Sequence, residues 1–459
     1  MKYVTDNCVK NELLIRGIGM ENKTFYYPGR AEAKESMDVS AAVALAEKIP
    51  MLNVNLSNYK YYRNPVLIGG QPGQWDEKGI SRAVVYRNGR DDWRMWYDGS
   101  SADGMMQVGY ATSPDGIRWT KYEGNPVLRP SETWEGQKIS ASSVVCMDGM
   151  FYLYYWVPGH YIPRQVKKIC LAVSRDGITW EKKGIVLDAD PPGWYESPSD
   201  GGSGVDAAKV FYMQQEARWY MIYTAFGAYG IWNGLAESKD GIQWTKREGP
   251  IISVRGPHNT MSFGIYGEAT LRCPIQIGSL WVGMTNAIGG GLFPAVALSL
   301  DAWTAIGRSL LPTKQDYEPG PHVRTPFSIA VADEAFFIYY AIGGRQQGYP
   351  GIGLIRAPMH SVHQPMILWE SERVMSKTDS MILEADRDPL TVYVASDREG
   401  SARLRVWNPA DKSWLDMAEE PVHPQQLHIL HAPSHARIRL VFRPAPGDAE
   451  AVVSAWATC

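Results

Sequence analysis

Acidic residues that recur at a fixed spacing are the first candidates for acid–base chemistry in this chain. A Ser-x-Asp-Gly-x-x-Trp element carries Asp115, Asp176 and Asp240 in three successive copies. The same Asp-Gly pair suits a tight turn, because the carboxylate can bond to nearby backbone amides and glycine accepts a positive φ. Chemistry that is copied in every repeat cannot be one active site, so these acids are predicted to be structural. The same reasoning applies to Asp76 and Glu135, each of which follows a loop tryptophan.

Histidine and cysteine side chains could bind a metal or act as nucleophiles, but their spacing supports neither role. His258 and His322 are isolated, and an isolated histidine near a loop is usually a hydrogen-bonding residue. The segment 428–435, HILHAPSH, holds three histidines on a stretch that contains proline, which predicts a surface position. Five scattered cysteines without a Cys-x-x-Cys pair indicate reduced thiols. No metal site is predicted from these residues.

Aromatic residues are the most unusual feature of the composition. The chain of 459 residues has 17 Trp and 25 Tyr against 10 Phe. Tryptophan and tyrosine combine a flat apolar face with a polar edge, which suits sugar-binding surfaces and interfaces. The formal net charge of −3 gives no reason to expect nucleic acid or an anionic membrane as a partner. No apolar run approaches the ~18 residues of a membrane span, and the first residues lack a signal-peptide core, so a cytoplasmic protein is expected.

The elements that must position these residues are defined by an internal repeat. Its anchoring tryptophans are Trp119, Trp180, Trp244 and Trp303, which are 61, 64 and 59 residues apart. Within each unit, alternating apolar and polar residues predict two hairpins, the second of which turns at the Asp-Gly pair. A unit of about sixty residues with four strands is typical of a propeller blade with long loops.

We therefore predict an all-β chain built around a five-bladed β-propeller of four-stranded blades at 61–358. The preceding residues 1–60 form an extension with one helix expected at 38–49, and this extension crosses the propeller face or serves a homodimer contact. After residue 358 the Asp-Gly-Trp turns disappear, while short alternating segments continue. Residues 359–459 are predicted to be a separate accessory β-region. The alternative is that they add two degenerate blades, which would make a seven-bladed propeller.

The first unit and its flanks, NPVL…WD…SRAVVYRNG…WRMWYDG…VGYATSPDGIRWTK…NPVL, carry a recognisable pattern. This sequence resembles the five-bladed glycosidase-like propellers, which include glycoside hydrolase families 32, 43, 62, 68 and 130. The resemblance covers roughly 61–358 and concerns mainly scaffold residues. In families 32 and 43 the active site lies at the funnel mouth, where the first strands of the blades begin and the second strands end. Cleavage of a glycoside there needs one protonated carboxyl group and one carboxylate.

Transferred to this chain, the resemblance departs from the usual set of catalytic acids. Blade one has Ser81 and Arg82 where the families usually have an Asp-Pro pair, and the matching strand of blade two starts at Ser140 without an acid. Acids remain in blades three and four. The resemblance therefore implies that Asp206 and Glu268 act as general acid and base.

Basic and aromatic residues at the same funnel mouth are predicted to bind the substrate. The inward arginines Arg82, Arg272 and Arg324 suit an anionic group such as carboxylate or phosphate, because guanidinium binds these groups bidentately. Family 130 phosphorylases hold phosphate with basic residues, but their acid-proline-arginine segment is not visible in this sequence. The alternative is that Arg82 and Arg324 merely pair with Asp206 and Glu268 and close the channel. The other predicted substrate-binding residues are Asp98, His160, Trp75, Trp156 and Trp232.

Three functions are compatible with these residues. The leading hypothesis is a carbohydrate-active enzyme, a glycoside hydrolase or phosphorylase-like enzyme, that acts on a sugar by acid–base chemistry at the funnel. The second is a non-hydrolytic enzyme of small-molecule biosynthesis, such as a cyclase, isomerase or lyase, on a propeller that has lost the usual acids. The third is a binding propeller without catalysis. No nucleotide, flavin or haem motif is present, so no cofactor is predicted. The carboxylates would be compatible with a calcium ion at the channel centre, and this alternative stays open.

Overall fold

The computed structural model describes a chain that is almost entirely β-structure. The helix expected at 38–49 is α1 (Val39–Ala46), which begins where the Asp38 carboxylate accepts a hydrogen bond from the Ser40 amide at 2.6 Å. Two short 3-10 turns follow it, η1 (Pro50–Leu52) and η2 (Leu56–Tyr59). Within the described part of the chain, no helix is long and apolar enough to cross a membrane. The described residues are 37–157, 166–189, 204–227, 230–252, 267–268, 270–287, 291–307, 309–311, 315–318, 326–344, 348–385, 388–447 and 450–458.

The hairpins of the repeat form antiparallel sheets of the propeller type. The first sheet contains β2 (Gly79–Asn88), β3 (Asp92–Ser100), β4 (Met106–Ser113) and β5 (Thr120–Lys121). After the 3-10 turn η3 (Thr133–Glu135), the second contains β6 (Ser140–Met147), β7 (Met150–Val157), β8 (Lys168–Ser174) and β9 (Glu181–Leu187). The third contains β10 (Gly204–Met213), β11 (Arg218–Gly227), β12 (Gly230–Ser238) and β13 (Trp244–Lys246), with β14 (Gly267–Glu268) beside β12. The fourth contains β15 (Thr270–Ile277), β16 (Leu280–Ala287), β17 (Gly291–Ser299) and β18 (Ala302–Ala305), and the last group contains β19 (Pro326–Ala332), β20 (Ala335–Gly344) and β21 (Gly348–Pro358).

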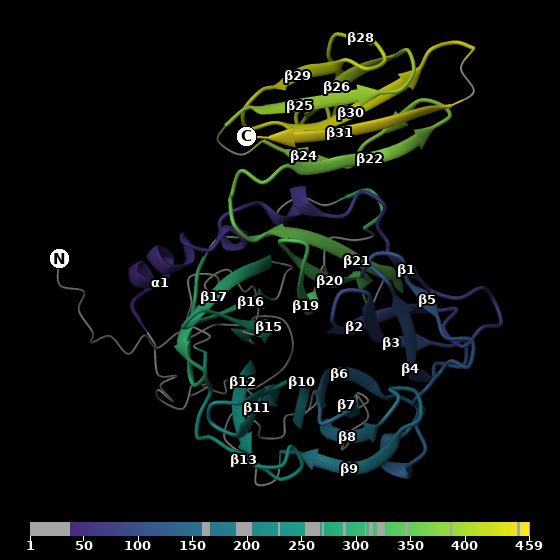
Figure 1. Ribbon diagram of the computed structural model, residues 1–459. Coiled ribbons are helices and arrows are strands. Elements are labelled where there is room, and N and C mark those ends of the chain that lie inside the picture. The colour runs from purple at the N-terminus through teal and green to yellow at the C-terminus, as the bar shows by residue number, and fades with distance from the viewer. Residues whose placement is uncertain are drawn as a thin grey trace, which may run out of the picture.

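The innermost strands of these sheets lie side by side in a closed ring. β2 contacts β6, β6 contacts β10, β10 contacts β15, β15 contacts β19, and β19 contacts β2 (Figure 1). The short strand β1 (Leu67–Ile68) joins the ring from the other end of the repeat, because Leu67 pairs with Ile352 on β21. This pairing covers the edge that β21 would otherwise expose. The strand that completes the last group thus precedes the first sheet in the sequence, and the repeat pattern did not predict it.

Each inner strand is interrupted by a β-bulge near its head. The breaks in register lie at 81–84, 141–143, 206–209, 272–275 and 326–328. Arg82, Ala207 and Cys273 adopt φ angles of +50°, +49° and +48° at three of these bulges. A bulge adds one residue to a strand and re-aims the side chains around it. At the first bulge, the Arg82 side chain reaches the second sheet, where it meets Ser140 and Trp156.

The recurring Asp-Gly turns are structural, as predicted. The Asp115 carboxylate accepts hydrogen bonds from the backbone amides of Ile117 and Arg118 at 2.9 and 2.8 Å. Asp176 and Asp240 repeat this arrangement in the next two sheets. Burial opposes ionisation of Asp176, but the backbone amide bonds outweigh it and lower the pKa to about 2.

The glycine of each turn also holds neighbouring sheets together. Its carbonyl oxygen accepts a hydrogen bond from an aromatic side chain on the second strand of the adjacent sheet. The repeated turn therefore closes a hairpin and fastens one sheet to the next. The donor and acceptor pairs are Trp96 and Gly177 at 2.8 Å, Tyr154 and Gly241 at 2.7 Å, and Tyr339 and Gly116 at 2.7 Å.

Asp76 and Glu135 are structural as well, since each buried carboxylate forms an ion pair within its own sheet. Lys121 Nζ lies 2.6 Å from Asp76, and Lys182 Nζ lies 2.5 Å from Glu135. Both lysines come from the outermost strand, and both acids come from the loop before the innermost strand. The pairs fix these loops against their sheets, where an unpaired buried charge would be costly.

After β21 the chain forms two further sheets, which Figure 1 shows apart from the ring. One sheet has the order β22 (Met366–Val374), β31 (Ala451–Thr458), β25 (Leu390–Ser396) and β29 (Leu427–Ala432). The other has β23 (Thr378–Asp379) and β24 (Leu383–Glu384) on β30 (Arg437–Pro444), followed by β26 (Gly400–Asn408), which pairs with β27 (Ser413–Asp416) and β28 (Glu420–Val422). Alternate residues of β25 and β31 are buried, as expected for sheets that pack face to face. We call this pair of sheets the C-terminal sandwich.

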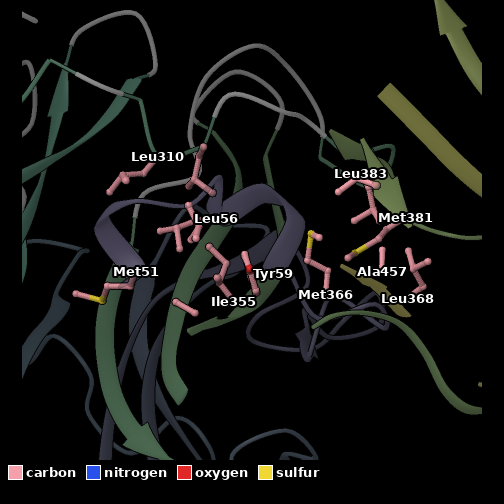
Figure 2. Packing of buried hydrophobic residues seen from close by; sticks show 14 of the residues in the cluster. Met51, Leu56, Tyr59, Leu310, Ile355, Met366, Leu368, Met381, Leu383 and Ala457 are labelled. Atoms are coloured by element: carbon pink, nitrogen blue, oxygen red, sulfur yellow. The ribbon is translucent and has the colours of Figure 1, made fainter. Parts of the chain in front are cut away.

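One continuous hydrophobic cluster joins the ring to the C-terminal sandwich. Leu56 and Tyr59 of η2, Ile355 of β21, and Met366 and Leu383 of the sandwich are all buried in it (Figure 2). The turns between α1 and β1 therefore lie at the junction of the two parts. Burial of apolar surface across this junction stabilises both parts together.

Two side-chain amides reinforce this junction by acting like additional strand residues. The Gln315 amide donates to the Ile382 carbonyl and accepts from the Ile382 amide, both at 2.7 Å. The Asn58 amide makes the same two bonds with Glu384, both at 2.9 Å. These bonds satisfy the backbone of 382–384 where it enters the interface.

Candidate functional site

A buried carboxylate, Asp98, links the first two sheets at the head of their inner strands. Asp98 is the residue opposite Ser81 and is only 1% exposed. Its carboxylate accepts hydrogen bonds from the Ser140 hydroxyl at 2.5 Å and the Ala141 amide at 2.8 Å, and Arg82 Nη1 lies 3.4 Å away. Burial raises the pKa of Asp98 to about 6, although Arg82 and these hydrogen bonds act in the opposite direction.

The indole of Trp156, at the end of β7, lies beside two cations. The Arg82 guanidinium is 4.7 Å from its ring centroid, and Lys167 Nζ is 5.6 Å from it. Both distances are within the range of a cation–π interaction. Lys167 Nζ also lies 3.1 Å from the Asp206 carboxylate. A chain of contacts, Asp98–Arg82–Trp156–Lys167–Asp206, therefore spans the first three sheets, and we call it the charge chain.

Asp206, the residue predicted to transfer a proton, is buried at the head of β10, opposite Thr224. Its lysine partner is held there by the backbone, because the Val205 amide donates to the Lys167 carbonyl at 3.0 Å. A Cβ atom at Gly204 would collide with the Lys167 backbone, and Gly204 adopts a φ of +111°. Glycine at this position therefore lets the two strands approach closely enough for the ion pair.

The charge chain combines the groups that acid–base chemistry on a polar substrate requires. It holds two carboxylates, each beside a cation, at strand ends that converge in the ring. The alternative in which Arg82 pairs with Asp206 or Glu268 is wrong for the described residues, because Arg82 pairs with Asp98 and Asp206 pairs with Lys167. Arg324, the other arginine of that alternative, lies outside the described residues. Among the described residues, no cluster of three or more His, Cys, Asp or Glu side chains could hold a metal ion.

A second group of basic residues lies further along the inner strands. Lys209 Nζ donates to the backbone carbonyls of Ser142 at 2.8 Å and Phe327 at 2.6 Å, so it ties β10 to both β6 and β19. Burial lowers the pKa of Lys209 to about 8, and the nearby Arg272 acts in the same direction. The Arg272 guanidinium lies 5.8 Å from the Phe327 ring. Arg272 thus neighbours Lys209, whereas Arg82 belongs to the charge chain.

The tryptophans expected to stack on a substrate contact the protein itself. Trp75 lies 5.8 Å from the ring centroid of Tyr97, and a Cβ atom at Gly99 would overlap its indole. Trp232 is buried in the same hydrophobic cluster as Trp156. Trp75 and Trp232 therefore pack against the protein, and Trp156 contacts the cations Arg82 and Lys167.

Three predicted residues fall wholly or partly outside the described residues. Arg324 and His160 lie outside them, and so does the side chain of Glu268. The Glu268 backbone pairs in parallel with Ile231 as part of β14, whereas the inner strand β15 begins at Thr270. By this register Glu268 belongs to the segment that leads into the fourth sheet.

Lys167 and Lys209 are the residues that reasoning from the sequence missed. Lys167 lies just before β8 in the pair Lys167–Lys168, and the corresponding strand of the first unit begins with Met106, so the repeat offered no signal. Lys209 did offer one. A lysine in the inner strand GVDAAKV, among small and apolar residues, is a charge in a segment expected to be buried.

Comparison with known proteins agrees with this architecture. No protein-family model matches the chain. It is 31% identical over 130 residues to a 1,2-beta-oligomannan phosphorylase of Thermoanaerobacter sp. (strain X514), an alignment that covers 27% of this chain and 43% of the phosphorylase. It is 32% identical over 155 residues to the raffinose invertase of Escherichia coli, covering 29% of this chain and 30% of the invertase. A solved glycoside hydrolase superposes with a TM-score of 0.51 at 17% identity, over 71% of this chain and 99% of the hydrolase.

The chain has the fold of a solved glycoside hydrolase. The sequence matches extend over less than half the length of the phosphorylase and of the invertase. The structural match, in contrast, covers almost the whole solved glycoside hydrolase and shows that this propeller protein shares its fold. A shared fold does not define the chemistry, which depends on the residues at the head of the inner strands.

Proposed function

We propose that this propeller protein is a carbohydrate-active enzyme that cleaves a glycosidic bond at the head of the inner strands. The observation that carries the proposal is the charge chain, in which Asp98 and Asp206 each pair with a cation and both cations contact Trp156. The similarity to an oligomannan phosphorylase and to raffinose invertase supports a sugar substrate. The closed ring of inner strands supports counting the sheets as five blades.

In this proposal the carboxylates and the cations have separate roles. Asp206 exchanges a proton with the glycosidic oxygen, and Glu268, in the segment that leads into the fourth sheet, is the second carboxylate that such a reaction requires. Asp98 is a positioning residue that holds Arg82 through the contact at 3.4 Å. Arg82 and Lys167 orient the polar groups of the substrate, and Arg272 and Arg324 extend this basic lining.

The acceptor of the glycosyl group is water or phosphate in this proposal. With water, the glycosidic bond is replaced by a bond to hydroxyl, and two free sugars are released. With phosphate, the sugar leaves as a glycosyl phosphate, and the leaving oxygen again takes a proton. The two outcomes differ in mass and in their need for added phosphate.

The test is product detection by mass spectrometry with the full chain. The substrates are β-1,2-oligomannan, raffinose and sucrose, each with and without inorganic phosphate. We expect turnover by the wild type and a decrease of at least about 100-fold in Asp206→Asn, because loss of a general acid or base typically costs that much. Absence of any product from a folded wild type would contradict the proposal.

Asp76→Asn is the matched control for this experiment. It makes the same substitution in another Asp–Lys pair with a buried carboxylate, with Lys121 of the outermost strand of the first sheet at 2.6 Å. Both variants lose a buried ion pair, so both should lose similar stability. A comparable loss of activity in both would mean that Asp206 acts only through folding.

A binding propeller without catalysis is the second candidate, and the Lys167–Asp206 pair at 3.1 Å favours it. An ion-paired carboxylate can simply close the space between two strands. In that case the wild type binds oligosaccharide without turnover, and Asp206→Asn leaves the affinity unchanged. Isothermal titration calorimetry with the same sugars distinguishes this outcome from catalysis.

A further inference from the structure

The outward face of one sheet in the C-terminal sandwich carries an aromatic pair that the proposed catalytic function does not use. Along β25 the side chains of Val392 and Val394 are buried, while those of Thr391 and Tyr393 are partly exposed. The same alternation along β31 buries Ala455 and leaves its neighbours partly exposed. Successive residues of a strand point to opposite faces, so one face of the sheet β22–β31–β25–β29 is directed to solvent.

Four cross-strand neighbours, one on each strand of the sheet, form an apolar row across this outward face. Tyr393 pairs with Trp456 on one side and with Ile429 on the other, and Trp456 pairs with Ile367. The Tyr393 and Trp456 rings are 5.5 Å apart between centroids and are inclined by only 14°. Ile429 is 51% exposed, which shows that nothing described covers this end of the row.

Neutral side chains lie on both sides of the row. Thr391 pairs with Thr458 and with His431, and Ala395 pairs with Ser454 and with Leu427. These three levels of β31, β25 and β29 contain hydroxyl groups and one imidazole but no Asp, Glu, Lys or Arg. The residues of this face are Thr391, Tyr393, Ala395, Leu427, Ile429, His431, Ser454, Trp456 and Thr458.

The outward face of the second sheet is very different, because it is covered with ion pairs. Arg403 lies 3.1 Å from Asp416, and Arg405 lies 3.0 Å from the same carboxylate group and 3.3 Å from Asp379. Trp407, on the same strand as these arginines, pairs with Trp414 on β27, and the two ring centroids are 5.4 Å apart. The contrast within one sandwich indicates that the neutral face is matched to an uncharged partner.

We propose that the neutral face around Tyr393 and Trp456 binds an uncharged polysaccharide chain, at a site separate from the charge chain. Tyr393 and Trp456 stack on each other, so the ring surface that this pair leaves uncovered is what can contact the apolar faces of sugar rings. The hydroxyls of Thr391 and Thr458 can exchange hydrogen bonds with sugar hydroxyls, and the Ser454 hydroxyl, which accepts from the Ser371 amide at 3.1 Å, can donate one. An anionic polymer would find no counter-charge on these three levels. The exposed row continues to the edge strand β29, so an extended chain can lie across the strands and leave the sheet at either end.

The test is retention of the full chain on uncharged polysaccharides in native affinity electrophoresis. The gels contain β-mannan, levan, xylan or soluble starch, with polygalacturonate as the anionic comparison. We expect at least one uncharged polymer to slow the wild type, and Tyr393→Ala and Trp456→Ala each to weaken the affinity about tenfold or more, as is typical for a central aromatic contact. Tyr393→Phe keeps the ring and should retain binding.

Trp407→Ala is the matched control, because it removes a partly exposed tryptophan from the charged face of the same sandwich. This variant should be slowed as much as the wild type. Asp206→Asn should also be retained, so a failure of the catalytic proposal would leave this result unchanged.

Three results would overturn the proposal. They are no retardation of the wild type by any uncharged polymer, equal loss in Trp407→Ala and Trp456→Ala, and stronger retardation by polygalacturonate. Light scattering coupled to gel filtration examines the other occupant of such a face, a second copy of the chain. A dimer that Trp456→Ala converts to a monomer would assign the face to self-association instead.

Discussion

Asp98 shows how burial between the inner strands of the propeller changes the pKa of a single carboxyl group. Burial favours its neutral form, whereas Arg82, Ser140 and the Ala141 amide favour the charged form. Burial is the larger effect, and the pKa rises from 3.8 to about 6. A carboxyl group with a raised pKa in the folded state contributes stability below pH 4 and loses this contribution as the pH passes through about 6.

We expect Asp98→Asn to remove this pH dependence. The free energy of unfolding of the wild type, relative to that of the variant, should fall by about 2–3 kcal/mol between pH 4 and pH 7. Urea titrations monitored by tryptophan fluorescence measure the difference at both pH values. A difference between wild type and variant that is the same at pH 4 and pH 7 would contradict the dominance of burial.

The Asp-Gly hairpin is the element that builds the ring. Its aspartate closes the turn locally, and its glycine carbonyl accepts the bond from the next sheet, as Trp96 Nε1 does to Gly177 at 2.8 Å. The sequence repeat therefore encodes a contact between sheets as well as a turn. A side chain at the glycine would strain the turn and also push against the aromatic donor.

We expect Gly177→Ala to destabilise the protein more than Gly149→Ala does. Both glycines have positive φ angles, +79° and +72°, so both variants lose about 1–2 kcal/mol from the backbone alone. A Cβ atom at Gly177 would lie 2.8 Å from the Trp96 ring, whereas one at Gly149 has no atom within 4 Å. Gly177→Ala should therefore lose about 1–3 kcal/mol more in urea unfolding. Equal decreases in the free energy of unfolding would show that the contact between this turn and the neighbouring sheet does not contribute to stability.

At the scale of the whole molecule, the ring and the C-terminal sandwich share one hydrophobic cluster. Leu383 is 1% exposed within it, and the amide bonds of Gln315 and Asn58 hold the adjoining backbone. Parts that share a buried interface of this kind unfold together unless the interface is weakened.

We expect one thermal transition for the wild type and two for Leu383→Asp in differential scanning calorimetry. Burying a carboxylate at this junction costs several kcal/mol, which is on the order of the whole stability of a domain. Met375→Asp, at a position that is 75% exposed on the same sandwich, should keep the single transition. Two transitions in the wild type would show that the ring and the sandwich are energetically independent.

Much of the architecture followed from local chemistry and was predictable. The strands could be predicted because alternation and Asp-Gly turns are properties of short segments, and the structural roles of Asp115, Asp176 and Asp240 followed from their repetition. The position of α1 followed from the apolar run after Asp38. The similarity in the scaffold residues was also visible, and the comparisons agree with it.

The members of the charge chain could not be predicted from the sequence, because they are brought together by contacts between sheets. Alternation and turn residues were enough to predict the strands, the turns and the position of Asp206 at a strand head. Contacts between distant segments were needed to show that Asp98 accepts a bond from Ser140, that Lys167 is the partner of Asp206, and that β1 completes the last sheet. These partners are tens to hundreds of residues apart, and closing the ring is what brings them within hydrogen-bonding distance. A repeat pattern describes each unit, whereas the geometry between units follows from how the bulged inner strands pack around the ring.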